Sequence, residues 1–576
     1  MMARALTIGL ASPLVFALAA CGAPTAPSGP QIGSQTNWLL ACRSANDCNG
    51  LRCLCGVCSD LCQDSAECGD FDGASCIQAD DEGAVAVCAG IAPPAGMCLP
   101  RCTAGCPLGT DCIAGVCAPL GSPAETPLAA SVEAAQGAQS STPNVLVDAS
   151  VRHQTLAGFG AAIVYTEGAI VAHPDREALY DLLFKDSGLD AFRLGNRYEP
   201  GAAERIRRTG QIVAAASERI GRPPLLFMTS PSPPAALKAN GRRRCAGELE
   251  TCTLASSPDA RFDYTAFARY WRQALDAYAN AGVTPAYVSI QNNPNWVPPA
   301  DNPLDGCRFL PAEGTATVTI DDRTVEVAYP GYREALTAVR AAVADLQTPP
   351  RFVAPEASGL RSVGDYVTAL GGASFDAIAV HLYDMDAAAV DIAALSSAQA
   401  LATTTDRPIF QTEMRASGLE TAILAHHAVT AGGASAYLQN DLIATTRGGA
   451  PVSLVHLTGE GFAPQGPYYA LQHYAKHTDP GWVRVDAAST GTDVLASAWL
   501  SPDERALTVV LVNPETEAMQ VELMLTDALP QRLARSEITR TVFASSEHGA
   551  HKGALAEDAI VELPAGSIVT VAFTAD

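Results

Sequence analysis

The sequence predicts an α/β protein whose main domain is a (β/α)8 TIM barrel, with a C-terminal β-sandwich beside it and a small disulfide-rich module before it. Three observations favour this architecture. Short apolar runs alternate with helical patterns over residues 144–482, 14 of the 18 cysteines gather near the N-terminus, and short strands separated by turns follow residue 483. A chain of 576 residues is long enough for several such domains.

The first 20 residues are typical of an export signal. Arg4 precedes an apolar run from Ala5 to Ala20, which is shorter than the roughly 20 residues that a membrane-spanning helix needs. The run ends in Leu-Ala-Ala-Cys, which is similar to a bacterial lipobox and implies that Cys21 carries a lipid. An ordinary secretory signal with a chance cysteine is the alternative. We therefore expect an exported protein, held at the bacterial outer membrane or cell surface by its lipid alone, with residues 21–41 as a tether.

Residues 42–120 form a cysteine-rich segment that predicts a disulfide framework. Such a small exported unit has little core, and its 14 cysteines can form up to seven bridges. A zinc site is the alternative, because Cys55 and Cys58 have metal-ligand spacing, although no histidine lies between residues 42 and 117. The segment could serve as a stalk or as a binding module. Its cysteines are Cys42, Cys48, Cys53, Cys55, Cys58, Cys62, Cys68, Cys76, Cys88, Cys98, Cys102, Cys106, Cys112 and Cys117.

Charge and composition narrow the remaining possibilities. The net charge of −24 comes with no basic stripe that could neutralise phosphates, so we expect no nucleic-acid partner. Residues 121–143 are rich in small and polar residues and predict a linker. A doubly wound open sheet is the main competitor of the barrel, but no Gly-rich nucleotide loop follows an early strand. We expect neither a cofactor nor a metal at the functional site.

Eight apolar runs, with helical patterns between them, match a (β/α)8 barrel in number and order. The clearest helical pattern is Tyr264–Ala281, where Phe267, Trp271 and Tyr278 recur at helical spacing. The other expected helices are Ala202–Ile220, Tyr332–Leu346 and Leu419–Ala431. The expected barrel strands are Thr155–Ala162, Ala191–Gly195, Pro224–Thr229, Ala286–Gln291, Phe352–Ala354, Asp376–Tyr383, Ile409–Thr412 and Ala434–Leu442. The expected β-sandwich, residues 483–576, contains Val494–Trp499, Leu507–Val512, Val521–Leu525 and Ile568–Phe573.

The carboxyl ends of the strands are where a barrel of this kind carries its active residues. The predicted seventh strand leads into Glu413, and the predicted fourth strand leads into Gln-Asn-Asn-Pro at residues 291–294. A glutamate at a strand end is often a surface residue without a role. The surrounding motifs must therefore decide whether Glu413 belongs to a site.

Six short motifs occur in a fixed order along the barrel and the side domain. They are Gln-Thr-Leu-Ala-Gly-Phe-Gly-Ala-Ala (154–162), Ser-Pro-Ser-Pro-Pro-Ala (230–235), Val-Ala-Pro-Glu (353–356), His-Leu-Tyr (381–383), Tyr-Tyr-Ala-Leu (468–471) and Leu-Pro-Ala-Gly-Ser-Ile-Val-Thr (563–570). With this order the chain resembles glycoside hydrolase family 30, which includes glucosylceramidases, xylanases and β-1,6-glycanases. The resemblance covers about Val145 to the C-terminus.

The resemblance implies a retaining site with two carboxylates about 5–5.5 Å apart, one a nucleophile and the other a general acid and base. It places Glu413 at the nucleophile position. The family's fourth-strand pattern is Gln-Asn-Glu-Pro, so Asn293 occupies the acid/base position. An amide has the size of a carboxyl group but no proton that titrates near neutral pH, so it cannot protonate a leaving oxygen.

The resemblance also implies roles for the neighbouring residues. Asn292 would bind the 2-hydroxyl of the sugar, and Arg193, His381 and Tyr383 would orient Glu413. The resemblance implies an altered sugar platform, because Pro231 and Ala236 in the third-strand loop and Asn440 on the eighth strand stand where the family commonly has tryptophan. Replacement platforms could come from Trp296 or Tyr198, each of which could equally be a packing residue.

Other side chains could compensate for the missing acid or add a reactive group. A carboxylate displaced onto a loop could replace the acid, and the candidates are Glu356, Asp384, Asp301, Asp441 and Glu460. We expect Cys245 and Cys252 to form a disulfide. Cys307 would then remain unpaired, as a buried thiol or, less simply, a reactive one.

Two functional hypotheses follow, and both have a polysaccharide or oligosaccharide as partner. The first is a surface β-glycanase or glycosidase with an altered or relocated acid/base. The second is a catalytically silent relative that binds glycans at the cell surface.

Overall fold

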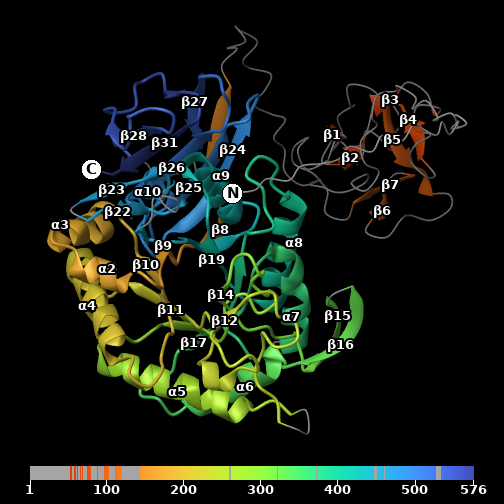
Figure 1. Ribbon diagram of the computed structural model, residues 1–576. Helices are drawn as coiled ribbons and strands as arrows, with labels where there is room; N and C mark the ends of the chain where they lie inside the picture. The colour runs from red at the N-terminus through yellow and green to blue at the C-terminus, as the bar shows by residue number, and fades with distance from the viewer. Residues whose placement is uncertain are drawn as a thin grey trace, which may run out of the picture. The chain divides into compact units, whose positions relative to one another are not determined.

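Eight parallel strands close into a barrel in the computed structural model of the protein (Figure 1). The strands follow one another around the barrel in chain order, and the last strand pairs with the first. This arrangement is the predicted (β/α)8 barrel, and its closure excludes a doubly wound open sheet. The strands are β9 (Gly158–Ile163), β10 (Ala191–Gly195), β11 (Leu225–Thr229), β13 (Tyr287–Ser289), β17 (Arg351–Ala357), β18 (Ala377–His381), β19 (Ile409–Met414) and β20 (Ala434–Gln439).

The structure describes residues 143–575 apart from 258–260, 321, 372–373, 446–450, 460 and 527–532, together with shorter stretches between residues 52 and 119. The chain divides into two units, Met1–Gln139 and Ser140–Asp576. The predicted signal, the lipidation residue Cys21, the tether and residues 121–142 of the linker lie outside the described residues. Within the described part of the chain, no helix has the length and apolar character needed to span a membrane.

Aromatic rings and alanines fill the interior of the barrel. The rings of Phe227, Tyr287 and Phe410 lie with their centroids 5.0–5.4 Å apart. Small residues on the neighbouring strands, such as Ala379 and Ala436, leave room for these rings and are buried with them. Alternating large and small side chains in this way makes the interior a packed core, so a functional cavity must lie at an end of the barrel.

Helices form a ring around the barrel strands (Figure 1). Helix α5 (Tyr264–Asn280) begins where Asp263 accepts a hydrogen bond of 2.8 Å from the N–H of Ala266. It buries the face that carries Phe267 and Trp271, as its spacing predicts. The four expected helices are confirmed as α4, α5, α6 and α9, with ends shifted by a few residues. Besides α5, the described α-helices are α2 (Glu167–Ala172), α3 (Arg176–Tyr180), α4 (Ala203–Ile220), α6 (Tyr332–Val343), α7 (Val363–Leu370), α8 (Ile392–Thr405), α9 (Gly418–Val429) and α10 (Gly466–Ala475).

A β-rich side domain forms one hydrogen-bonded sheet of nine strands, with a hydrophobic core of its own. Its first strand is β8 (Asn144–Thr155). The predicted domain boundary gave residues 144–155 to the barrel domain, but in the structure they belong to the side sheet. β8 lies between β24 and β27 in the side sheet. Its early residues alternate between buried and more exposed positions, which suits a sheet with one covered face. The other strands are β24 (Val483–Thr490), β25 (Leu495–Leu500), β26 (Ala506–Asn513), β27 (Met519–Leu525), β28 (Arg535–Val542), β29 (Ala550–His551), β30 (Ile560–Leu563) and β31 (Ser567–Thr574).

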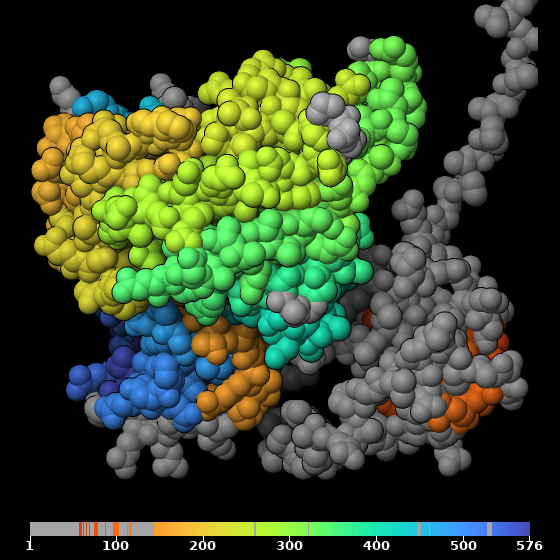
Figure 2. All heavy atoms as spheres, turned by 90° about the horizontal axis from the view of Figure 1, so that it is seen from below, coloured from red at the N-terminus to blue at the C-terminus, as the bar shows by residue number. Residues whose placement is uncertain are grey.

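Long loops follow the third and fourth barrel strands and pair with each other through β12 (Arg244–Cys245) and β14 (Leu304–Asp305). Cys245 and Cys252 form the expected disulfide, and Cys307 is free and buried, as expected. Burial raises the pKa of the Cys307 thiol to about 12, which disfavours the reactive alternative. The hairpin of β15 (Gly314–Ile320) and β16 (Arg323–Tyr329) extends from the edge of the barrel (Figures 1 and 2). Three short strands, β21 (Ile443–Ala444), β22 (Val455–Leu457) and β23 (Phe462–Pro464), follow β20.

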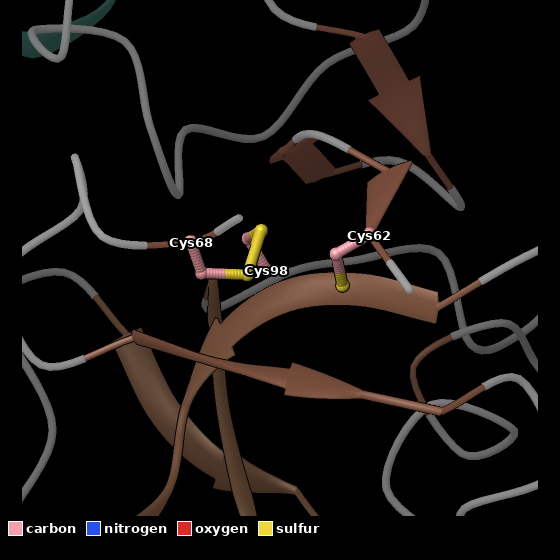
Figure 3. A group of neighbouring side chains, drawn as sticks. All are labelled: Cys62, Cys68 and Cys98. Atoms are coloured by element: carbon pink, nitrogen blue, oxygen red, sulfur yellow. A yellow bond between two sulfur atoms is a disulfide. The ribbon is translucent and has the colours of Figure 1, made fainter. Parts of the chain in front are cut away.

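Disulfides hold the N-terminal unit, as its cysteine content predicts. Cys62 pairs with Cys76, Cys68 with Cys98, and Cys102 with Cys112. The sulfur atoms of Cys62, Cys68 and Cys98 lie within 4.8 Å of one another (Figure 3), but each belongs to a disulfide and is no thiolate ligand for zinc. Cys58, one of the two residues of the zinc alternative, is also disulfide-bonded. The strands are β1 (Arg52–Leu54), β2 (Val57–Ser59), β3 (Leu61–Cys62), β4 (Ala74–Ile77), β5 (Gly96–Pro100), β6 (Thr110–Ile113) and β7 (Val116–Pro119).

Candidate active site

A cavity of about 850 Å³ lies at the carboxyl ends of the barrel strands. Its size is that of a small-molecule or oligosaccharide site. Of the predicted catalytic and substrate-binding residues, Glu413, Asn293, Asn292, Arg193, Tyr383, Trp296 and Asn440 line it, and His381 lies behind Asn293. The lining residues that matter below are Tyr165, Arg193, Pro231, Asn292, Asn293, Trp296, Asp305, Arg361, Tyr383, Asp384, Glu413, Arg415, Asn440 and Asp441.

Arg193, in the middle of β10, connects the charged groups of the site. Its Nε donates a hydrogen bond of 2.8 Å to Glu356, its Nη1 one of 2.6 Å to Glu413, and its Nη2 one of 2.6 Å to Asn292. Burial alone would lower the pKa of Arg193, but the two carboxylates outweigh that effect and hold it above its ordinary range. One permanent cation therefore serves two carboxylates and an amide.

Glu413, near the end of β19, is held by two neighbours. Arg193 binds one carboxylate oxygen, and the hydroxyl of Tyr383 donates a hydrogen bond of 2.8 Å to the other. Burial would raise the pKa of Glu413, but the charge of Arg193 and these contacts leave it below its usual value. The carboxylate is thus ionised near neutral pH and fixed in direction, which is the state that a nucleophile requires.

Glu356, at the end of β17, lies beneath the cavity. It accepts hydrogen bonds from Arg193 and from Thr229 Oγ1, and its side chain is almost fully buried. Burial would raise the pKa of this carboxyl, but Arg193 and His381 hold it far below its usual range. An ionised carboxylate has no proton to give, so Glu356 is a poor substitute for the missing acid.

Asn293 lines the cavity at the end of the fourth strand, where the resemblance expects a glutamate. Its backbone N–H donates to the carbonyl of Glu356 at 3.1 Å, and its φ of 46° lies in a region that asparagine adopts more readily than most residues. His381 Nδ1 donates a hydrogen bond of 2.8 Å to its amide oxygen. The position is therefore preorganised around an amide that can bind a glycosidic oxygen but not protonate it.

Asn292 and the back wall complete the polar part of the site. The amide oxygen of Asn292 accepts from Arg193, which leaves its amide nitrogen as a donor for a hydroxyl in the cavity. His381 is fully buried, and its Nε2 lies 3.7 Å from Glu356. Both ring nitrogens of His381 therefore face side chains of the site, Nδ1 facing Asn293 and Nε2 facing Glu356.

The residues discussed as sugar platforms separate into two groups. Pro231, Asn440 and Trp296 line the cavity, so the indole of Trp296 is available to a ligand. Ala236 is exposed on the short helix after β11 and does not line the cavity. Tyr198 packs against the barrel core, with its ring centroid 6.4 Å from that of Tyr270. Of its two predicted roles, it is therefore a packing residue and not a sugar platform.

The candidate displaced acids also separate. Asp384 lines the cavity, but its carboxylate accepts hydrogen bonds from the backbone N–H groups of residues 360 and 361. Asp441 lines the cavity and pairs with Arg415 at 2.9 Å; burial raises its pKa despite this pairing. Asp301 is exposed and does not line the cavity, and Glu460 lies outside the described residues. Asp441 is the one with an environment that favours protonation.

The cavity residues that the sequence reasoning missed include Tyr165, Arg415 and Asp305. Tyr165 stands two residues after β9, and Arg415 stands one residue after β19. Their positions at strand ends were a usable signal, but the search considered carboxylates and family motifs. Asp305 lies on the long fourth-strand loop, whose path no local pattern indicates.

Comparison with known proteins identifies the fold. No protein-family model and no curated protein matches the sequence. Among solved structures, the catalytic domain of the family 30 xylanase C from Talaromyces cellulolyticus covers 75% of this chain and 100% of its own, at 17% identity and a TM-score of 0.58. A conserved exported protein from Bacteroides fragilis matches 74% of this chain and 100% of its own, at 14% identity and a TM-score of 0.59. An endo-β-1,6-glucanase matches 75% of this chain and 94% of its own, at 14% identity and a TM-score of 0.53.

These matches define a class of protein by fold. The chain has the barrel and the β-rich side domain of glycoside hydrolase family 30 structures. The named neighbours include enzymes of xylan and of β-1,6-glucan. At identities below 20% the likeness concerns the fold, so the activity of this chain has to be argued from its own site.

Proposed function

We propose that the chain acts on or binds β-linked polysaccharides or oligosaccharides in this cavity, with Glu413 as the nucleophile of a retaining-type site and Asn293 in the acid/base position. The carrying observation is the Glu413 carboxylate, which Arg193 and Tyr383 hold ionised in the cavity that Asn293 also lines. The sugar's 2-hydroxyl would face the free amide nitrogen of Asn292.

The chemistry expected of this site is incomplete. Glu413 attacks the anomeric carbon and the bond to the leaving oxygen breaks, which gives a glycosyl-enzyme ester. An alkoxide leaving group needs a proton at that moment, and Asn293 has none to give. Loss of general acid/base help costs about 10²–10⁴ in rate. The first step should therefore proceed well only with a leaving group that needs no protonation.

A second candidate function is glycan binding without cleavage. The specific observation in its favour is the hydrogen bond between His381 and the Asn293 amide, which stabilises a group that does not titrate. In this case Glu413 and Asn292 are binding groups, and the barrel is a silenced relative of the enzymes with which it shares its fold.

The experiment that separates the two functions compares the parent chain with Asn293→Glu and Glu413→Gln on dinitrophenyl β-glycosides and on a panel of β-glycans. We expect the parent to release dinitrophenol in a burst, azide to speed turnover because it needs no base, and Glu413→Gln to abolish both. Asn293→Glu should raise glycan cleavage by about 10²-fold or more. Asn293→Asp serves as a control that introduces a titratable group without a change of size. Aspartate also tolerates the positive φ of residue 293.

Each outcome has a distinct meaning. Ordinary cleavage of glycans by the parent, unchanged in Asn293→Glu, would show that the acid/base position is wrongly assigned. In that case Asp441→Asn should lose activity. A parent that binds glycans but forms no glycosyl-enzyme even from dinitrophenyl donors is the silent binder. A folded parent that neither binds nor cleaves any glycan would contradict the whole proposal.

The location of the protein is part of the proposal. The Leu-Ala-Ala-Cys sequence supports export and lipidation at Cys21, which would place the glycan cavity at the bacterial surface. The disulfides of both units support an oxidising compartment, because such bonds persist outside the reducing cytosol.

A further inference from the structure

Tyr165 is an exposed aromatic side chain at the mouth of the cavity. It stands two residues after β9, lines the cavity, and is 53% exposed, the largest exposed fraction among the described large hydrophobic residues. Ligand pockets are lined mainly by hydrophobic and aromatic side chains, so an exposed ring in this cavity is a candidate ligand contact.

The ring is held in place from two sides. The guanidinium carbon of Arg197 lies 4.6 Å from the ring centroid, so a cation covers one face of the ring. The hydroxyl of Tyr165 donates a hydrogen bond of 3.4 Å to Asp305 on the fourth-strand loop. With one face covered and the hydroxyl engaged, the ring is held in position while its side chain remains 53% exposed in the cavity lining.

We infer that Tyr165 is the sugar-stacking platform of this cavity and replaces the aromatic residues missing at Pro231 and Asn440. A pyranose whose hydroxyls are all equatorial offers axial C–H groups on both faces, and these pack well on an aromatic ring. The platform therefore favours gluco- or xylo-configured β-glycans over manno-configured ones, whose axial 2-hydroxyl interrupts one face. The inference rests on the proposed function, because it requires that the cavity binds a glycan.

The contrast with Tyr198 shows why Tyr165 is more than a packing residue. Both tyrosines lie near the ends of neighbouring barrel strands, but Tyr198 packs on the barrel core and does not line the cavity. The buried Nε of Arg197 has no hydrogen-bond partner among the described residues, and its guanidinium lies over the Tyr165 ring. Tyr165 thus differs from Tyr198 in being exposed within the cavity lining and in having a cation over its ring.

The test is calorimetric titration of the full exported chain with cellotetraose, xylotetraose and mannotetraose. Tyr165→Ala should weaken binding of the first two by roughly 3- to 10-fold, the range of an aromatic stacking contact. Tyr165→Phe keeps the ring and should stay within about twofold of the parent. The matched control is Tyr469→Ala, which removes a half-buried tyrosine that stacks on His548 outside the cavity.

The specificity readout distinguishes a platform from a purely structural role. Tyr165→Ala should reduce the ratio of cellotetraose to mannotetraose affinity, with an unchanged thermal midpoint. Equal affinities for the parent and Tyr165→Ala, or an equal loss for all three sugars, would overturn the inference alone. A parent that binds none of the three tetrasaccharides would overturn the inference, and the wider β-glycan panel then decides whether the proposed function fails as well.

Discussion

Arg193 is the residue on which the site depends most. Its guanidinium is buried among two carboxylates and an amide, and each of its three nitrogens is used. A buried ion pair of this kind adds little net stability compared with an apolar core, but removal of one partner leaves the others uncompensated. The side chain therefore positions Glu413 and at the same time makes its burial tolerable.

Replacement of Arg193 by methionine should destabilise the protein by about 3–5 kcal/mol near neutral pH. Without the cation, burial would raise the pKa values of Glu356 and Glu413, so the folded variant takes up protons as the pH falls. The stability deficit relative to the parent should therefore shrink between pH 7 and pH 4.5. Urea unfolding at both pH values measures it.

A surface arginine provides the control for this prediction. Arg207→Met removes an exposed guanidinium that pairs with Glu204 on helix α4. Its free energy of unfolding should match that of the parent at both pH values, because an exposed ion pair contributes little to stability. A deficit in Arg193→Met that is small, or equal at both pH values, would mean that the carboxylates do not depend on this cation.

The site residues divide into those that sequence could predict and those that it could not. Glu413 was found at the end of a predicted strand, and the roles of Arg193 and Asn292 followed from the family resemblance of the motifs around them. Tyr165 and Asp305 were missed, because their place in the cavity depends on where a loop passes. The charge state of Glu356 was also out of reach, since burial and Arg193 act on its pKa in opposite directions.

At the scale of elements, helix α10 joins the barrel to the side sheet through His473. The ring is 1% exposed, with Nδ1 2.8 Å from Thr570 Oγ1 and Nε2 2.9 Å from Thr541 Oγ1. Those threonines belong to β31 and β28. Burial lowers the pKa of His473 to about 3, with a smaller contribution from His477. A neutral imidazole is therefore part of the contact between the two domains.

This histidine should make the protein less stable in acid. Its pKa is about 6.5 in the unfolded chain and about 3 in the folded one, so the unfolded chain binds more protons between these values. The contribution of His473 to the free energy of unfolding is fully present above pH 6.5 and is lost as the pH decreases toward 3. From pH 7.5 to 5, the loss from this site should be about 2 kcal/mol.

The measurement is the difference in urea unfolding between pH 7.5 and pH 5 for the parent, His473→Gln and His551→Gln. His473→Gln should lose about 2 kcal/mol less than the parent over that interval, because it has no imidazole to protonate. The control is His551→Gln on β29, an exposed position, which should show the same difference in free energy of unfolding between the two pH values as the parent. Identical intervals in the parent and His473→Gln would refute the assignment.

Elements were predicted where their pattern is local. The spacing of Phe267, Trp271 and Tyr278 determines which face of α5 is buried, and eight buried apolar runs form the barrel strands. The membership of β8 could not be predicted, because it depends on pairing with β24 and β27, more than 300 residues away in sequence. Alternation along β8 indicates a strand but not its partners.

At the scale of the whole molecule, the proposed anchor can be tested at Cys21. Wild-type chain expressed in a bacterial host should sediment with membranes, incorporate labelled fatty acid, and dissolve only in detergent. Cys21→Ser should remain soluble in the exported fraction and incorporate no lipid. The cavity should be unaffected, because it lies in the unit that begins at Ser140.

The control is a substitution at the neighbouring Gly22, which should still be labelled and sediment. Cys21→Ser that still sediments with membranes after a high-salt wash would contradict a lipid anchor. Release of the wild-type chain in soluble form would instead support the ordinary secretory signal.

The position of β8 has a mechanical consequence. A chain held at its N-terminus and bound to a glycan in the barrel cavity transmits tension through residues 144–155, because β8 leads directly into β9. The hydrogen bonds between β8 and its neighbours β24 and β27 run across the strand, so a pull along β8 loads many of them at once instead of opening them one by one. The side sheet would then act as a shear joint between the proposed tether and the barrel that is proposed to bind the sugar.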